Sequence, residues 1–141
     1  MAACHITRRN MAQKFIEMVG ITDVGSVRQF NEDSIAFDSE SGAMVLADGM
    51  GGHRAGEVAS RIATEVIFNE IKSRIADFGN AVARLSPSLA IDQSLQRANA
   101  AVHQAAEANP SYEGMGTTSA VAVFPYQPGT PRHTGEPRVH P

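Results

Sequence analysis

The stretch that decides the fold is Ala43-Met-Val-Leu-Ala-Asp-Gly-Met-Gly-Gly-His53. Its first five residues form a compact apolar run, which predicts a buried strand. The run stops abruptly at Asp48, and three glycines follow within four residues. Such a strand holds the carboxylate rigidly, while the glycines let the backbone turn tightly and bring carbonyl or amide groups close to an ion or a phosphate. A plain tight turn explains the same residues equally well.

Two kinds of nucleotide site do not fit this stretch. No Gly-Lys-Ser/Thr follows the glycines, which excludes a Walker A loop, and the spacing of a dinucleotide fingerprint is not met. Asp48 would repel phosphates unless a cation lay between them, which favours a divalent metal with hard oxygen ligands, Mg²⁺ or Mn²⁺. A nucleotide-binding module stays as a third interpretation, and it requires nucleotide affinity that survives Asp48→Asn.

A second polar cluster lies upstream, in Gly25-Ser-Val-Arg-Gln-Phe-Asn-Glu-Asp33. Two adjacent acids most often form a solvated turn. Here a predicted hairpin separates them from Asp48, and an antiparallel return of that length places Glu32 and Asp33 at the same end of the sheet as Asp48. Arg28 offers a bidentate donor for a phosphate. Three carboxylates around a metal, with an arginine at the rim, would make a reasonable phosphoester hydrolysis site.

The middle of the chain has a helical period. The first apolar face, ended by Gly79, consists of Ala59, Ile62, Ala63, Val66, Ile67, Ile71 and Ile75. Ser86 and Pro87 are typical of the start of a second helix, and Asn109-Pro110 of its end. Its apolar face consists of Ile91, Leu95, Ala98, Val102 and Ala105. Thr117 to Phe124 then predicts a strand, so the pattern is short strands, a helix pair and a further strand.

Composition limits the classes of function. The chain has 141 residues, of which 43% are hydrophobic and 19% charged, so we expect one globular domain. The net charge of −3, with Lys and Arg scattered, argues against a nucleic-acid partner. No stretch approaches the roughly 20 apolar residues of a membrane span, and the single cysteine, Cys4, predicts a cytoplasmic protein. We expect a poorly ordered leader over residues 1–18 and a disordered Pro/His/Arg-rich tail over 125–141.

Three motifs together carry a resemblance to a known family. Gly25-x-x-Arg28-x-x-Asn-Glu-Asp33, then Asp48-Gly-Met-Gly-Gly-His53 with Gly56-Glu-Val-Ala-Ser60, then Gly114-Met-Gly-Thr-Thr118, resemble in order and spacing the first motifs of bacterial PPM (PP2C-type) serine/threonine protein phosphatases. The similarity covers residues 19–124, which we expect to be the N-terminal part of the phosphatase domain. The resemblance implies an α+β fold, an antiparallel β-sandwich flanked by helix pairs with a two-metal centre at one end.

The resemblance also implies roles for individual residues. Asp48 would bridge two Mn²⁺ or Mg²⁺ ions, while Glu32 and the Gly49 carbonyl would hold the second one. Asp33 would orient the attacking water, and Arg28 would hold the substrate phosphate. The Gly116-Thr-Thr118 segment would be structural. The implied partners are a phosphorylated protein substrate and an opposing serine/threonine kinase.

The sequence departs from the family in two places. Met50 stands where many eukaryotic relatives have a histidine, and the nearby His53 is interpreted as an ordinary loop residue. Nothing after Phe124 matches the family's later segment or the two aspartates that complete its first metal site. We therefore expect a domain truncated after its first half with one metal site incomplete. The alternative interpretation is an inactive fragment or a non-catalytic phosphoprotein-binding remnant.

Overall fold

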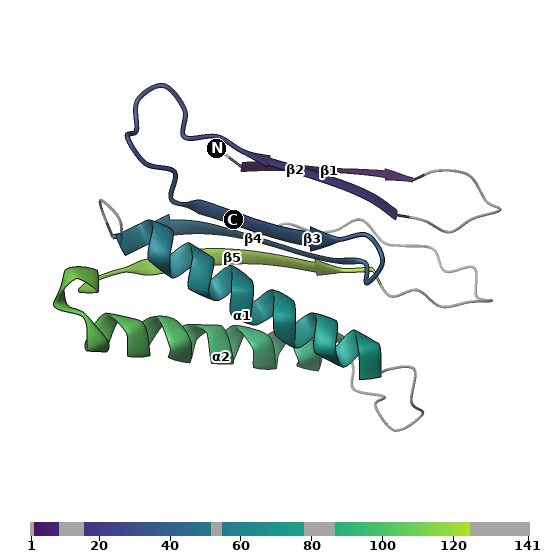
Figure 1. Ribbon diagram of the computed structural model, residues 1–141. Helices are drawn as coiled ribbons and strands as arrows, with labels where there is room; N and C mark the ends of the chain where they lie inside the picture. Colours follow the sequence, from purple (N-terminus) through teal and green to yellow (C-terminus); the bar gives the residue numbers. More distant parts are fainter. Residues whose placement is uncertain (1, 9–15, 52–54, 78–86, 125–141) are drawn as a thin grey trace.

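The computed structural model describes residues 2–8, 16–51, 55–77 and 87–124. These residues form three layers, with a two-stranded hairpin, a three-stranded sheet and a pair of helices stacked in that order (Figure 1). The elements are β1 (Ala2–Arg8), β2 (Ile16–Thr22), β3 (Asp33–Asp38), β4 (Ala43–Met50), α1 (Ala55–Asp77), α2 (Pro87–Ala108), the short 3₁₀ helix η1 (Pro110–Tyr112) and β5 (Gly116–Val123).

The three-stranded sheet is antiparallel in the order β3-β4-β5. Its central strand is β4, and burial alternates along it because successive side chains point to opposite faces. Ala43, Val45 and Ala47 are buried toward the helices, whereas Met44 and Leu46 face the hairpin layer and are half-buried. The strands predicted at 43–47 and 117–124, and the hairpin predicted between Asp33 and Asp48, are therefore confirmed.

Both predicted helices are confirmed. Along α1 the buried apolar side chains recur at four-residue spacing and form the centre of the core with β4, and they are Ala55, Ala59, Ala63, Ile67 and Ile71. Ala98 and Val102 of α2 complete this core. Full burial of one isoleucine side chain contributes about 1.5–3 kcal/mol, so the apolar face of α1 accounts for much of the attachment of the helix layer. The termini predicted from Gly79 and Ser86 lie outside the described residues.

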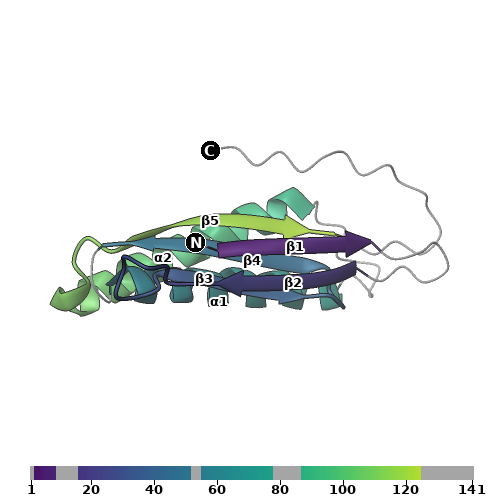
Figure 2. The ribbon, with the colours of Figure 1, turned by 90° about the horizontal axis from the view of Figure 1, so that it is seen from above.

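The hairpin of β1 and β2 covers the other face of the sheet. Viewed from above, β2 runs over β3 (Figure 2), and these two strands are in contact. Gly20 of β2 lies directly on Phe37 and Ile35, since a Cβ at Gly20 would be 2.7 Å from the Phe37 ring and 2.9 Å from Ile35 Cδ1. This stacking of two antiparallel sheets over a helix pair is the sandwich fold that the sequence resemblance implies.

The structure differs from the sequence-based expectation at the start of the chain. Residues 2–8 and 16–18, expected to be poorly ordered, belong to strands β1 and β2, which pair from Ala2 with Thr22 to Arg8 with Ile16. The backbone hydrogen bonds of this hairpin supply an order that the sequence pattern of the segment does not reveal. The tail predicted over residues 125–141 lies outside the described residues. No helix within the described ranges is long and apolar enough to cross a membrane.

Candidate active site

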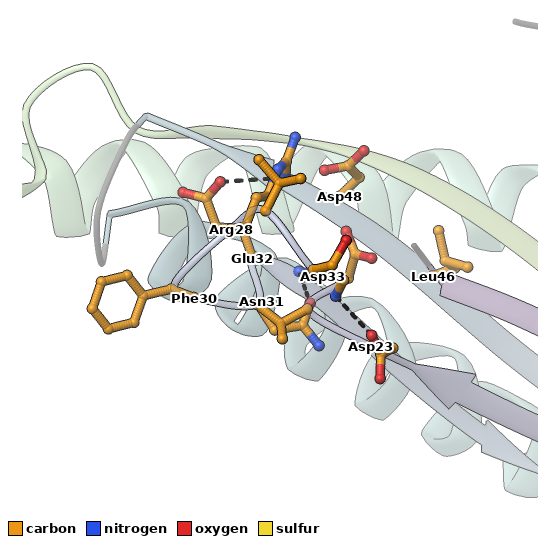
Figure 3. Close-up of a pocket in the computed structure, with 12 residues that line it drawn as sticks. Asp23, Arg28, Phe30, Asn31, Glu32, Asp33, Leu46 and Asp48 are labelled. Atoms are coloured by element: carbon orange, nitrogen blue, oxygen red, sulfur yellow. Dashed lines mark hydrogen bonds and ion pairs between the residues drawn. The ribbon is translucent and has the colours of Figure 1, made fainter.

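The acidic residues named from the sequence gather where β3 begins and β4 ends. Asp33 and Asp48 are direct cross-strand partners in the β3–β4 register, as predicted from the antiparallel return. Glu32 immediately precedes β3, and its carbonyl accepts a hydrogen bond of 3.0 Å from the Gly49 amide. A cavity of about 520 Å³ opens at this end of the sheet, and Arg28, Glu32, Asp33 and Asp48 are among the residues that line it (Figure 3).

Glu32 has the most confined carboxylate of this group. Its side chain is 15% exposed, and it packs against the first turn of α1. Among the side chains that the structure describes, Glu32 Oε1 is a buried oxygen without a hydrogen-bond partner. Leaving a polar atom in that condition costs about 1–3 kcal/mol. This oxygen is therefore the atom of the site that would gain most from a cation or a donor.

Two glycines make the room that Glu32 occupies. A Cβ at Gly49 would lie 2.1 Å from the Gly56 carbonyl oxygen, and a Cβ at Gly56 would lie 2.6 Å from Glu32 Oε1. Neither position tolerates a side chain without movement, so the end of β4 and the first turn of α1 approach each other at backbone distance. The sequence predicted that the backbone after Asp48 approaches an ion or a phosphate; what the structure shows is the approach of the Gly49 backbone to that of Gly56.

Arg28 lies at the rim of the cavity and faces Glu32. Its Nη1 is 3.6 Å from Glu32 Oε2, a loose ion pair, and the Arg28 side chain is 63% exposed (Figure 3). The two oxygens of the Glu32 carboxylate therefore have different surroundings. Oε2 faces the long cationic side chain of Arg28, whereas Oε1 is enclosed. Because the Arg28 side chain is exposed and the separation is long, we expect this pair to contribute no more than about 1 kcal/mol, so little free energy holds Arg28 in this position.

The strand β5 supports the site from the other side. Thr118 pairs with Asp48 and Thr117 with Gly49 in the β4–β5 register. The Thr117 hydroxyl oxygen lies 2.9 Å from the Asp48 carbonyl oxygen, to which it donates a hydrogen bond. The Gly116-Thr-Thr118 segment therefore lies beside the Asp48 backbone, as its interpretation as a structural segment requires.

Comparison with known proteins decides the family. The family model described as Protein phosphatase 2C matches residues 25–131 of this chain. The chain belongs to the protein phosphatase 2C family. The serine/threonine protein phosphatase PstP of Mycobacterium tuberculosis is 36% identical over 103 residues, which are 73% of this chain and 18% of PstP. The serine/threonine phosphatase stp of Listeria monocytogenes is 32% identical over 106 residues, which are 73% of this chain and 40% of that protein.

Solved structures of the family agree with the fold. The catalytic domain of PstP in complex with two manganese ions superposes with a TM-score of 0.57 at 28% identity, covering 88% of this chain and 43% of that one. A second crystal structure of the M. tuberculosis phosphatase gives the same TM-score at 30% identity, over 88% of this chain and 42% of that one. The chain thus spans less than half the length of each of these family members.

The donors at the site fit a metal ion only in part. Carboxylate and carbonyl oxygens suit hard divalent cations, and the enclosed Glu32 Oε1 lacks a partner. Within the described ranges, however, no group of three His, Cys, Asp or Glu side chains is close enough to hold a metal ion. The structure therefore brings Glu32, Asp33 and Asp48 to one end of the sheet without closing them into a ligand cluster. Met50 pairs with Gly116 at the end of β4, and His53 lies outside the described residues.

Sequence reasoning missed the residues that support this candidate site. Gly56 was noticed only within a motif, although its missing side chain makes the space for Glu32. Asn31 was given no role, although its side chain makes two hydrogen bonds at the site, one of them with Thr22. Asp23 accepts a hydrogen bond of 2.7 Å from the amide of Gly25, where φ is +74°. The Asp-x-Gly pattern at 23–25 is typical of such a turn and could have predicted it.

Proposed function

We propose that this chain carries the N-terminal half of the site of a metal-dependent protein serine/threonine phosphatase, which hydrolyses phosphoserine and phosphothreonine monoesters. The observation that carries the proposal is the convergence of Glu32, Asp33 and Asp48 with Arg28 on one cavity at the end of the sheet. Membership of the protein phosphatase 2C family supports it, as do relatives named serine/threonine phosphatases.

The proposed roles are those that the family resemblance implies, and the chemistry and position of each residue support them. Glu32, Asp48 and the Gly49 carbonyl would hold Mn²⁺ or Mg²⁺, because they present hard oxygens at one end of the sheet. Such ions supply neutralisation of phosphate charge and a lowered pKa for a water molecule. Asp33, opposite Asp48 in the register, would orient that water toward phosphorus. Arg28 has the exposure and the planar guanidinium required to hold the phosphate oxygens.

The proposed metal and partners rest on the relatives. The manganese ions in the PstP structure favour Mn²⁺, with Mg²⁺ as the other candidate. A phosphatase of phosphoserine and phosphothreonine implies phosphoprotein substrates and a serine/threonine kinase that opposes it. We propose a cytoplasmic setting, which the single cysteine of the chain supports.

A second candidate function is a non-catalytic remnant that binds phosphoproteins without hydrolysing them. One observation favours it. Nowhere in the described part of the chain do three acidic, His or Cys side chains form a metal cluster. A cavity with Arg28 at its rim can bind a phosphate without turnover.

Hydrolysis of p-nitrophenyl phosphate and of a phosphothreonine peptide by the purified 141-residue chain, with and without Mn²⁺, tests the proposal. Turnover that requires Mn²⁺ and is lost in Asp48→Asn establishes the catalytic function. Asp92→Asn is the matched control, because it removes one carboxylate charge from the exposed side of α2. A folded chain that binds the phosphopeptide but does not hydrolyse it contradicts the catalytic proposal and establishes the second candidate.

A further inference from the structure

The Asn31 side chain connects the two sheets of the sandwich at the acidic end. Asn31 Nδ2 donates a hydrogen bond of 2.8 Å to Thr22 Oγ1, at the last residue of β2. Asn31 Oδ1 accepts a hydrogen bond of 3.1 Å from the amide of Asp33, at the first residue of β3. Both bonds are partly buried. One side chain thus joins the end of the hairpin layer to the start of the acidic strand.

The orientation of the Asn31 amide is determined by its partners. The Asp33 backbone N–H can only donate, so the oxygen of the Asn31 amide must face it. The nitrogen of the amide then faces Thr22 Oγ1, which can accept. A reversed amide would place two donors against each other at Asp33. The Thr22 hydroxyl therefore completes the only arrangement in which both ends of the amide are satisfied.

The two hydrogen bonds of the Asn31 side chain, called here the Thr22–Asn31 bridge, restrain the main chain of Glu32 and Asp33. The Asn31 side chain accepts a hydrogen bond from the Asp33 amide, which follows Glu32 in the chain. The Glu32 carbonyl in turn accepts a hydrogen bond from the Gly49 amide. The backbone of residues 31–33 is thereby tied to β2 and to β4, and the hydrogen bond between Asn31 and Asp33 braces it internally. Because a rigid main chain limits where its side chains can point, these attachments restrict the directions of the Glu32 and Asp33 carboxylates.

We propose that Asn31 and Thr22 are positioning residues for the acidic pair, and that the Thr22 hydroxyl transmits the position of the hairpin layer to the site. The inference rests on the proposed function in one respect, that the correctly placed acids bind a divalent cation. Thr22 touches neither the acids nor a substrate in this role. It acts through Asn31, so the hairpin of β1 and β2 contributes to positioning the acidic residues.

The matched substitutions are Thr22→Val and Thr22→Ser. Valine has the shape of threonine and suits a strand, so Thr22→Val removes the hydroxyl and leaves packing and strand propensity nearly unchanged. Serine keeps the hydroxyl and removes the methyl group. A role that depends on the hydrogen bond is lost in the valine variant and kept in the serine variant, whereas a packing role gives the opposite order.

Two readouts on the full 141-residue chain test the inference. The first is the hydrogen-exchange rate of the Asp33 amide by NMR, and the second is the Kd for Mn²⁺ by titration calorimetry. Loss of one hydrogen bond of ordinary strength predicts, for Thr22→Val, exchange about 3- to 10-fold faster and Mn²⁺ binding weaker by a similar factor, with Thr22→Ser near wild type. Melting temperatures of all three proteins confirm that each is folded.

The outcomes separate this inference from the proposed function. Asp33 exchange and Mn²⁺ affinity that stay at the wild-type values in Thr22→Val, or that change equally in Thr22→Ser, overturn the positioning role. A wild-type chain that binds no Mn²⁺ counts against the proposed function, and the exchange of the Asp33 amide then decides alone whether the bridge positions the acidic strand.

Discussion

Replacement of Gly56 by alanine tests the geometry at Glu32 directly. The new Cβ would lie 2.6 Å from Glu32 Oε1 and 2.9 Å from Glu32 Cδ, and 3.1 Å from the carbonyl carbon of Gly49. Ordinary contact begins near 3.4 Å, so the carboxylate must move by about 0.8 Å. The carboxylate end of the side chain is flexible and the Gly49 backbone is not. We therefore expect the Glu32 carboxylate to leave its enclosed position and turn toward Arg28.

The effect on stability is a balance of two opposing contributions. Alanine is favoured over glycine within a helix by about 0.5–1 kcal/mol, and Gly56 is the second residue of α1. Displacing Glu32 and compressing the contact with Gly49 costs more than this gain, since inserting a methylene into a packed region costs about 1–3 kcal/mol. The net change in the free energy of unfolding should be a destabilisation of about 1 kcal/mol, while Mn²⁺ binding should weaken by about tenfold or more.

A double-mutant cycle with Glu32→Ala isolates the contact. Without the Glu32 carboxylate, the Cβ at position 56 meets only the Gly49 backbone, and the helix preference of alanine should dominate. Gly56→Ala is therefore expected to destabilise the wild-type chain and to be neutral or stabilising in the Glu32→Ala background, measured by urea denaturation. The same change in unfolding free energy in both backgrounds would show that Gly56 and Glu32 do not share this space, and the reasoning would be refuted.

Two further predictions follow from contacts at either end of the hairpin of β3 and β4. Gly49→Ala places a Cβ 2.1 Å from the Gly56 carbonyl oxygen, which is part of the backbone and cannot easily move. The substitution should lower the free energy of unfolding by about 3 kcal/mol or more, measured by thermal denaturation. A melting temperature like that of wild type would contradict this. Hydrogen bonds from the Ser41 side chain and amide, and then Lys72 at 3.3 Å, hold the pKa of Asp38 below its ordinary value of 3.8. The stabilisation by this carboxylate is thus complete above about pH 4 and is lost as pH falls through the lower folded-state pKa. Asp38→Asn should therefore lower the free energy of unfolding by about 1 kcal/mol at pH 7, and by progressively less below pH 4, in paired urea titrations. An equal loss at pH 7 and pH 2 would contradict this prediction.

Local periodicity predicted the helix layer and the central sheet. The three- and four-residue spacing along residues 59–75 has one solution, an amphipathic helix, because no other regular element places those residues on one face. The position of the acids was also predictable, because a hairpin returns the chain to its starting end. Asp33 and Asp48 are therefore cross-strand partners, as the predicted hairpin requires.

Contacts between layers were not predictable in the same way. The approach of Gly56 to Glu32 depends on how α1 crosses the end of β4, which no spacing within either segment specifies. The pairing of β1 with β2 likewise depends on backbone hydrogen bonds that any sequence can form. The Thr22–Asn31 bridge joins two sheets through side chains whose local pattern is typical of an ordinary turn. In each case the missing information is the relative placement of two elements.

The condition of Glu32 links the stability of the fold to its proposed chemistry. A carboxylate that is 15% exposed, with one loose ion pair and one unpartnered oxygen, carries a desolvation cost that the contacts around it do not offset. The surroundings nevertheless hold it there, through the Gly49 amide on its carbonyl and the first turn of α1 against its side chain. A cation bound at Oε1 would remove that cost, so part of its binding free energy would come from strain already present in the folded chain. A residue kept in an unfavourable position by two separate elements, β4 and α1, is better explained by ligand binding than by folding, because folding alone would favour a neutral side chain at this position.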